Sequence, residues 1–165
     1  MYSRPPLAFR LRPAKLKGAM ARRWRTVFVE DQALFRNLLE RLLGADPRFE
    51  LIAGLADGES ALALCEKERP DFLMVDIQLP GMDGVSLARA ALKARPGLRI
   101  LALTTLTDAC TVNRVLEAGI HGYVEKDREL EELEAAMVRV AGGGEYQTDR
   151  VREVRNAFRG DPEAF

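Results

Sequence analysis

The sequence predicts an α/β fold, a doubly wound five-stranded parallel sheet in the order 2-1-3-4-5 with helices on both faces. Short apolar runs alternate five times with amphipathic stretches, a pattern typical of a parallel sheet covered on both faces. Right-handed crossovers between consecutive strands then favour the doubly wound order. The 165 residues are enough for one domain with a core of ordinary size.

The five expected strands are short and rich in aliphatic residues. The first is TVFVE, and the third, FLMVD, places four apolar residues directly before Asp76. A run that is apolar at every position predicts a central strand buried on both faces. The expected strands span residues 26–30, 49–55, 72–76, 99–104 and 122–126.

Each strand is followed by apolar residues at helical spacing, with turn residues at the ends. Asp57 and Asp83 are placed to cap the second and third helices, and Gly119 to end the fourth. The expected helices span residues 32–44, 57–68 and 85–94, a stretch that ends at 118, and 129–141. Their inner faces are expected to contain Leu34, Phe35, Leu38, Leu39 and Leu42 in the first helix, and Leu130, Leu133, Met137 and Val140 in the fifth.

Basic and acidic residues are distributed unevenly along the chain. The first 25 residues hold eight basic groups and no acidic one, which leaves 17 basic and 25 acidic groups in the remaining 140 residues. An acidic body argues against a nucleic-acid surface there. We interpret this basic N-terminal segment as a solvated extension. Contact with nucleic acid or anionic lipid is the alternative interpretation, and Met20 is an alternative start of the natural chain. The expected segments are a basic extension over 1–24, a globular body over 25–144, and a linker or docking helix over 145–165.

No apolar run approaches the roughly 20 residues of a membrane span, and no secretory signal is visible near the start. Cys65 and Cys110 lie far apart, each inside a helical pattern. We therefore expect buried thiols in a reducing, cytoplasmic compartment rather than a disulfide or a metal site. The tail helix, from Thr148, is expected to place Val151, Val154 and Phe158 on one side.

Polar residues stand where the expected strands end. The first strand ends in Glu30 and Asp31, the third in Asp76, the fourth in Thr104, and the fifth in Lys126. Ligands bind at this edge of such a sheet. Three clustered carboxylates suit Mg²⁺, and the ion together with Lys126 would prepare Asp76 as an in-line nucleophile toward phosphorus, with Thr104 hydrogen-bonded to a phosphoryl oxygen.

These motifs resemble the receiver domain of two-component response regulators, which has a flavodoxin-like fold. The resemblance covers about residues 25–142. Because no proline follows Lys126, the chain is most similar to the LuxR-type subfamily, whose members usually add a helix-turn-helix DNA-binding domain. The motifs are VED (29–31), VDIQLPGMDG (75–84), ALTT (102–105) and GYVEKD (122–127).

The resemblance implies a role for each matching residue. Asp76 corresponds to the acceptor of a phosphoryl group from a histidine kinase, and Lys126 to the residue that pairs with that group. Thr104 and Tyr123 correspond to the family's switch pair. The implied Mg²⁺ ligands are Asp31, Asp76 and the backbone carbonyl of Gln78, with Glu30 in contact with the ion through water.

Two residues depart from the family pattern. Glu30 stands where Asp is commonest, which affects only a water-mediated contact with the metal. Thr105 stands where Ala or Gly is usual. The DNA-binding domain is absent from these 165 residues, so DNA is expected as a partner only through a further C-terminal domain.

Alternative functions belong to other classes. A stand-alone receiver would act by protein contact or in a phosphorelay. An aspartyl-phosphate phosphatase usually needs an acid where this chain has Gln78, and a flavin-binding protein would need a phosphate-binding loop after the first strand. A homodimer is a further expectation, since Val138 lies off the inner face of the fifth helix, and His121 is expected to be a loop residue without a phosphotransfer role.

Overall fold

The computed structural model describes residues 22–105 and 107–160, and its parallel strands form one sheet in the order β2-β1-β3-β4-β5-β6. The order of the first five strands confirms the predicted topology, but the sheet has a sixth strand that was not predicted. The Met20 alternative, nearly all of the basic extension and residues 161–165 lie outside the described residues. The strands are β1 (Trp24–Val29), β2 (Phe49–Leu55), β3 (Phe72–Asp76), β4 (Arg99–Thr104), β5 (Gly122–Glu125) and β6 (Tyr146–Gln147).

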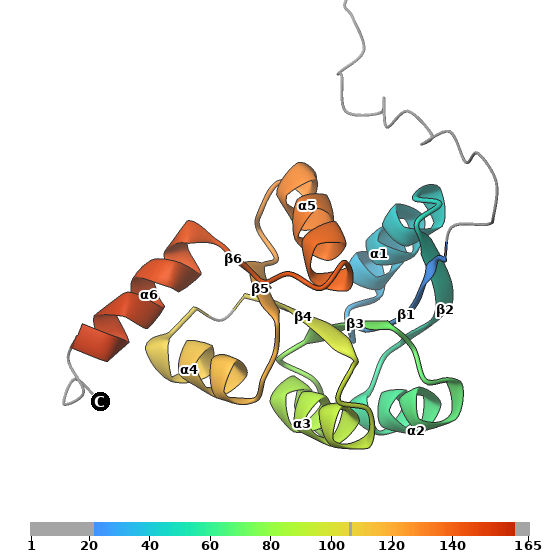
Figure 1. Cartoon of the computed structure of the whole chain (residues 1–165), viewed down its shortest axis with the longest axis horizontal. Coiled ribbons are helices and arrows are strands. Elements are labelled where there is room, and N and C mark those ends of the chain that lie inside the picture. Colours follow the sequence, from blue (N-terminus) through green and yellow to red (C-terminus); the bar gives the residue numbers. More distant parts are fainter. Residues whose placement is uncertain (1–21, 106, 161–165) are drawn as a thin grey trace, which may run out of the picture.

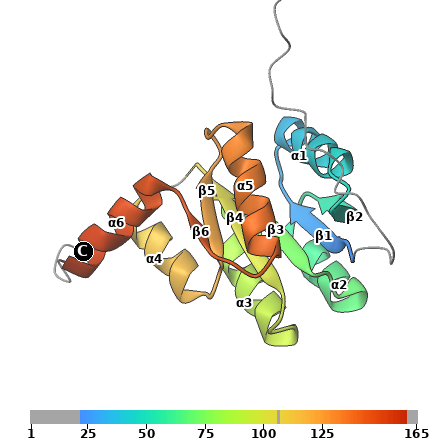
Figure 2. The same cartoon turned by 45° about the horizontal axis from the view of Figure 1, so that its top comes forward.

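Helices cover both faces of the sheet (Figure 1). In the two views α1 and α5 lie on one face and α2, α3 and α4 on the other, while α6 lies beside α4 near the β6 edge (Figure 2). The predicted caps are present, because the Asp57 carboxylate accepts from Ser60 N and the Asp83 carboxylate from Ser86 N. The helices are α1 (Ala33–Ala45), α2 (Gly58–Glu68), α3 (Gly84–Ala94), α4 (Ala109–Glu117), α5 (Leu130–Ala141) and α6 (Asp149–Gly160).

The sheet separates two apolar cores. Every residue of β3 is buried, and its alternating side chains enter both cores, which fits a central strand. The expectation that Leu34 lies on the inner face of α1 is wrong, because Leu34 is 86% exposed and Leu43 is buried instead. The expectation is also wrong for Leu130, the first residue of α5, which is 43% exposed.

The short strand β6 attaches the tail to the sheet. Tyr146 N donates to His121 O, and the Arg99 guanidinium holds the preceding turn by donating to the carbonyls of Val140 and Gly144. Gly143 adopts a positive φ of 103° in that turn, a conformation that favours glycine. The tail therefore continues the sheet before α6 begins.

Candidate functional site

Three strand ends meet at the carboxyl edge of the sheet, as the sequence predicted. Asp76 ends β3, Glu30 follows β1, and Lys126 follows β5. The Lys126 ammonium lies between two carboxylates, with Nζ 2.7 Å from Glu30 Oε2 and 2.8 Å from Asp76 Oδ2. Lys126 N also donates to Thr104 O at 3.1 Å, which places the end of β5 against the end of β4.

Asp31 completes a cluster of acids. One carboxylate oxygen from each of Glu30, Asp31 and Asp76 lies within 4.8 Å of the others. Glu30 and Asp76 are buried, whereas Asp31 is exposed. A set of hard oxygen ligands that is open on one side fits Mg²⁺, which binds a few protein oxygens and keeps several waters.

Burial and charge act in opposite directions on these groups. Burial raises the pKa of Asp76 above its ordinary value, and the ammonium of Lys126 opposes that rise. Burial raises the pKa of Glu30 in the same way, again against the effect of Lys126. For Lys126, burial would lower the pKa, but the two carboxylates outweigh it and raise the pKa, so the lysine keeps its charge at neutral pH.

Backbone groups hold the two buried carboxylates in place. Gln78 N donates to Asp76 Oδ1 at 3.0 Å, and Gln32 N donates to Glu30 Oε1 at 3.0 Å. At the start of α3, a Cβ added to Gly84 would lie 2.2 Å from Asp76 O. Only glycine allows the loop to pass this close behind Asp76.

Two residues of the predicted set lie at the exposed rim. Thr105 Oγ1 lies 3.2 Å from Gln78 Oε1 in a hydrogen bond that joins the loops after β4 and β3. Both side chains are exposed. The role expected for the Gln78 backbone carbonyl stays a prediction.

The two expected switch residues are fully buried. Thr104 ends β4, and Tyr123 lies in β5 within the core under α2, α3 and α4. Burial raises the pKa of the Tyr123 hydroxyl far above its ordinary value, so it stays protonated. Thr104 therefore lies at the end of β4 beside the site, whereas Tyr123 lies in the apolar core.

Sequence reasoning missed two residues that support the site. The ring of Phe35, expected only as a core residue, lies with its centroid 5.0 Å from Lys126 Nζ, a cation–π distance. Arg36 donates to the backbone carbonyls of Glu30 and Asp31 at 2.8 and 3.2 Å. Nothing in the helical pattern distinguishes Arg36 from the other basic residues on helix surfaces.

The family model of the response regulator receiver domain matches residues 27–138. The chain belongs to this family. The receiver is 37% identical over 120 residues to the transcriptional regulatory protein DegU of Brevibacillus brevis, covering 73% of this chain and 51% of DegU. It is 36% identical over 115 residues to the DNA-binding transcriptional activator DevR/DosR of Mycobacterium tuberculosis, covering 70% of this chain and 53% of that protein.

A solved structure confirms the fold of the receiver and its similarity to the LuxR type. The LuxR-family response regulator from Aurantimonas sp. SI85-9A1 superposes with a TM-score of 0.78 at 26% identity, covering 85% of this chain and all of that one. The receiver spans only about half the length of the curated relatives DegU and DevR/DosR.

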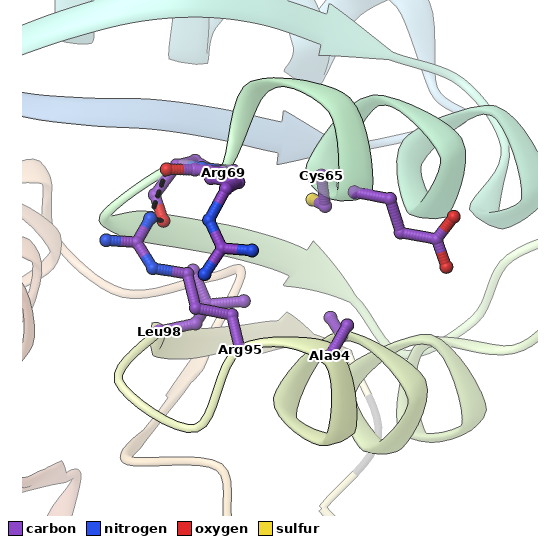
Figure 3. A pocket seen from close by; sticks show the side chains of 8 residues that line it. Cys65, Arg69, Ala94, Arg95 and Leu98 are labelled. Carbon is purple, nitrogen blue, oxygen red and sulfur yellow. Dashed lines mark hydrogen bonds between the residues drawn. The ribbon is translucent and has the colours of Figure 1, made fainter.

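A cavity of about 250 Å³ lies between the C-terminal ends of α2 and α3 (Figure 3). The Arg95 guanidinium, which lines it, already donates to the carbonyls of Arg69 and Pro70 and to Asp71. Cys65 is buried as expected, and burial raises the pKa of its thiol to about 11, so it is unreactive at neutral pH.

Three further expectations have structural outcomes. Cys110 is exposed, so the expectation of two buried thiols is wrong for this residue, which lies in the first turn of α4. Val138 is partly buried and packs against the core under α1 and α5, and the homodimer stays a prediction. None of the six helices in the described residues has the length and apolar composition of a membrane span.

Proposed function

We propose that Asp76 accepts a phosphoryl group from a histidine kinase, and that the Mg²⁺ required is held by Glu30, Asp31, Asp76 and the carbonyl of Gln78. The observation that carries this proposal is the buried Asp76 carboxylate, paired with Lys126 at 2.8 Å beside two further acids. Receivers bind Mg²⁺ at an acidic site, and the oxygen set of this chain fits that ion.

In the transfer, a carboxylate oxygen of Asp76 forms a bond to phosphorus while the bond from phosphorus to the donor imidazole nitrogen breaks. The nitrogen keeps the electron pair, and the product is an acyl phosphate. When bound at these acids, Mg²⁺ would neutralise negative charge on the phosphoryl oxygens. Lys126 moves its ammonium from the carboxylates to a phosphoryl oxygen, and the Thr104 hydroxyl hydrogen-bonds another, while Tyr123 changes its packing.

We propose that the receiver is a cytoplasmic signalling domain that acts on transcription through a DNA-binding domain elsewhere in a longer protein. Its relatives DegU and DevR/DosR are named as transcriptional regulators. Another relative, 29% identical, is named as a protein-glutamate methylesterase of which this chain covers 33%, so enzymatic output belongs to other parts of such proteins. A stand-alone receiver is the second candidate. We also propose the division into segments 1–24, 25–144 and 145–165.

The test is intact-protein mass after incubation with Mg²⁺ and acetyl phosphate. The expected result is the addition of one phosphoryl group, and EDTA should abolish it because the three acids then repel the incoming phosphate. Addition that is unaffected by EDTA would contradict the role of the acidic cluster.

A further inference from the structure

The loop that follows Asp76 is held at both ends by its own hydrogen bonds. It spans residues 77–83 and includes Gln78, whose carbonyl is a proposed Mg²⁺ ligand. Gln78 N donates to Asp76 Oδ1 at 3.0 Å, and Gly84 N donates to Ile77 O at 3.0 Å. These two hydrogen bonds fix where the loop begins and ends, and neither of them reaches its middle.

Glu59 of α2 holds the middle of this loop. Its Oε1 accepts a hydrogen bond from Met82 N at 3.0 Å, across 23 positions of sequence. Glu59 lies in the first turn of α2, where the helix dipole favours an acidic side chain, and Asp57 fixes that turn by accepting from Ser60 N. A hydrogen bond to an ionised acceptor is roughly twice as strong as one between neutral groups.

The loop and the start of α2 approach so closely that side chains are excluded on both sides of the contact. A Cβ added to Gly58, the first residue of α2, would lie 2.8 Å from Met82 O. One added to Gly81 would lie 2.7 Å from Glu59 Oε1. Gly81 also adopts a positive φ of 73°, a conformation that favours glycine. The contact with Glu59 is therefore part of how the loop is shaped, although the Glu59 side chain itself is exposed.

The path of the loop determines where the Gln78 carbonyl points. That carbonyl belongs to the planar peptide unit that joins Gln78 to Leu79, so its direction follows the chain from Leu79 onward. Leu79 is buried in the core, and Pro80 has a fixed φ. Because so few residues separate Gln78 from Met82, holding Met82 N restricts the orientations that the carbonyl can adopt. α2 contributes no residue to the acidic cluster, yet it acts on this metal ligand through the loop.

We propose that Glu59 is a positioning residue for the Mg²⁺ site, which holds Met82 N and so keeps the loop in the path that presents the Gln78 carbonyl to the ion. The inference rests on the proposed function. The apparent affinity for a ligand falls with the fraction of the protein that is in the binding-competent conformation. Loss of the hydrogen bond should therefore weaken Mg²⁺ binding, and it should leave the chemistry at Asp76 unchanged once the ion is bound.

The experiment combines hydrogen–deuterium exchange of the amides over 77–84 in the metal-free protein with titration calorimetry of MgCl₂ binding. In Glu59→Ala, exchange at Met82 should become roughly three- to tenfold faster, since a hydrogen bond of ordinary net strength is lost. The dissociation constant for Mg²⁺ should rise by a similar factor. Glu59→Gln keeps an oxygen that accepts from Met82 N and should behave nearly as the parent protein. Glu66→Ala, an exposed change on the same helix, is the matched control and should behave as the parent protein.

Phosphorylation by acetyl phosphate separates positioning from a general loss of stability. At saturating MgCl₂, Glu59→Ala should be phosphorylated at the parental rate. The MgCl₂ concentration that gives half of that rate should rise by the same factor as the dissociation constant. A merely destabilised protein would not show this shift, because its folded fraction would bind Mg²⁺ with the parental affinity.

Three results would overturn the positioning role while leaving the proposed function intact. The first is parental exchange at Met82 in Glu59→Ala, and the second is fast exchange combined with a parental affinity for Mg²⁺. The third is an equal loss of affinity in Glu59→Ala and Glu59→Gln, which would assign the effect to the charge and not to the hydrogen bond. If the parent protein neither binds Mg²⁺ nor gains a phosphoryl group, the proposed function is overturned, and this inference with it.

Discussion

At the residue scale, the acids of the site differ in their burial and in the groups that they contact. Glu30 is buried and engaged by Lys126 and by Gln32 N, whereas Asp31 is exposed at the open side of the cluster. The ammonium of Lys126 balances the two buried acids, and the exposed acid is placed to receive a hydrated cation. The two neighbours in sequence therefore have different roles.

Asp31→Ala should weaken Mg²⁺ binding more than Glu30→Ala. Direct coordination contributes more than a contact through water, so the loss for Glu30→Ala should be roughly tenfold and the loss for Asp31→Ala larger. Titration calorimetry measures both affinities, with Glu40→Ala on the exposed face of α1 as the control. Equal or reversed losses would refute the assignment.

Thr105 should slow hydrolysis of the acyl phosphate on Asp76. Its hydroxyl is engaged by Gln78 Oε1 at 3.2 Å, so the β-branched side chain is fixed at the rim and crowds the path of an attacking water. Thr105→Ala should shorten the lifetime of the phosphorylated protein several-fold, while Thr105→Val, which keeps the bulk, should not. A longer lifetime in the Ala variant would favour a role for the hydroxyl in holding the water.

His121 should make stability depend on pH. Its Nδ1 accepts from Ile100 N at 3.0 Å, which requires an unprotonated nitrogen. Burial lowers the pKa of His121 below its ordinary value of 6.5, with Arg99 adding to the effect and Glu145 opposing it. The unfolded chain therefore binds the proton first, and the free energy of unfolding should fall as the pH drops below about 6.5.

His121→Asn offers an uncharged oxygen in place of Nδ1 and serves as the control for this pH dependence. Denaturant unfolding of both proteins between pH 5 and pH 8 isolates the contribution of the histidine, since the buried carboxylates titrate in both. Curves that stay parallel over this range would show that His121 does not contribute.

At the element scale, strands and caps could be predicted well because they depend on local pattern. The bounds of β2, β3 and β4 agree with the expected ranges, and Asp57 and Asp83 cap their helices. The two residues of β6 are too few to form a pattern, and their pairing depends on the turn held by Arg99. A sequence cannot show that turn.

The same distinction applies to the site. Glu30, Asp31, Asp76 and Lys126 converge because strand ends of a parallel sheet must share an edge. The contact of Thr105 with Gln78 and the approach of Phe35 to Lys126 depend on side-chain conformations, which no spacing encodes. The exposure of Leu34 has a similar origin, since the helix rotates to bury Leu39 and Leu43 instead.

The loop that joins β3 to α3 should tolerate no side chain at Gly84. A Cβ there would lie 2.2 Å from Asp76 O and 2.8 Å from Ile77 Cα, so the backbone behind the acceptor must shift. Gly84→Ala should cost about 1–3 kcal/mol of stability and slow phosphorylation. Gly44→Ala, where a Cβ meets nothing within 4 Å, is the control for both unfolding and phosphorylation assays. Parental behaviour of Gly84→Ala would show that the loop adapts freely.

At the scale of the whole molecule, the acidic site lies at the carboxyl edge of the sheet. The tail adds β6 beside β5 and then continues as α6. The chain belongs to the receiver family and spans about half of the length of DegU and DevR/DosR. The tail is part of this architecture, since β6 extends the sheet and α6 lies beside α4 (Figure 2).

The central claim is that Asp76 is the acceptor. The most direct measurement is the intact mass of Asp76→Asn after incubation with Mg²⁺ and acetyl phosphate, compared with the parent protein and with Asp83→Asn, in which the amide oxygen can still cap α3. One added phosphoryl group is expected in the parent protein and in Asp83→Asn, and none in Asp76→Asn. Undiminished addition in Asp76→Asn would contradict it.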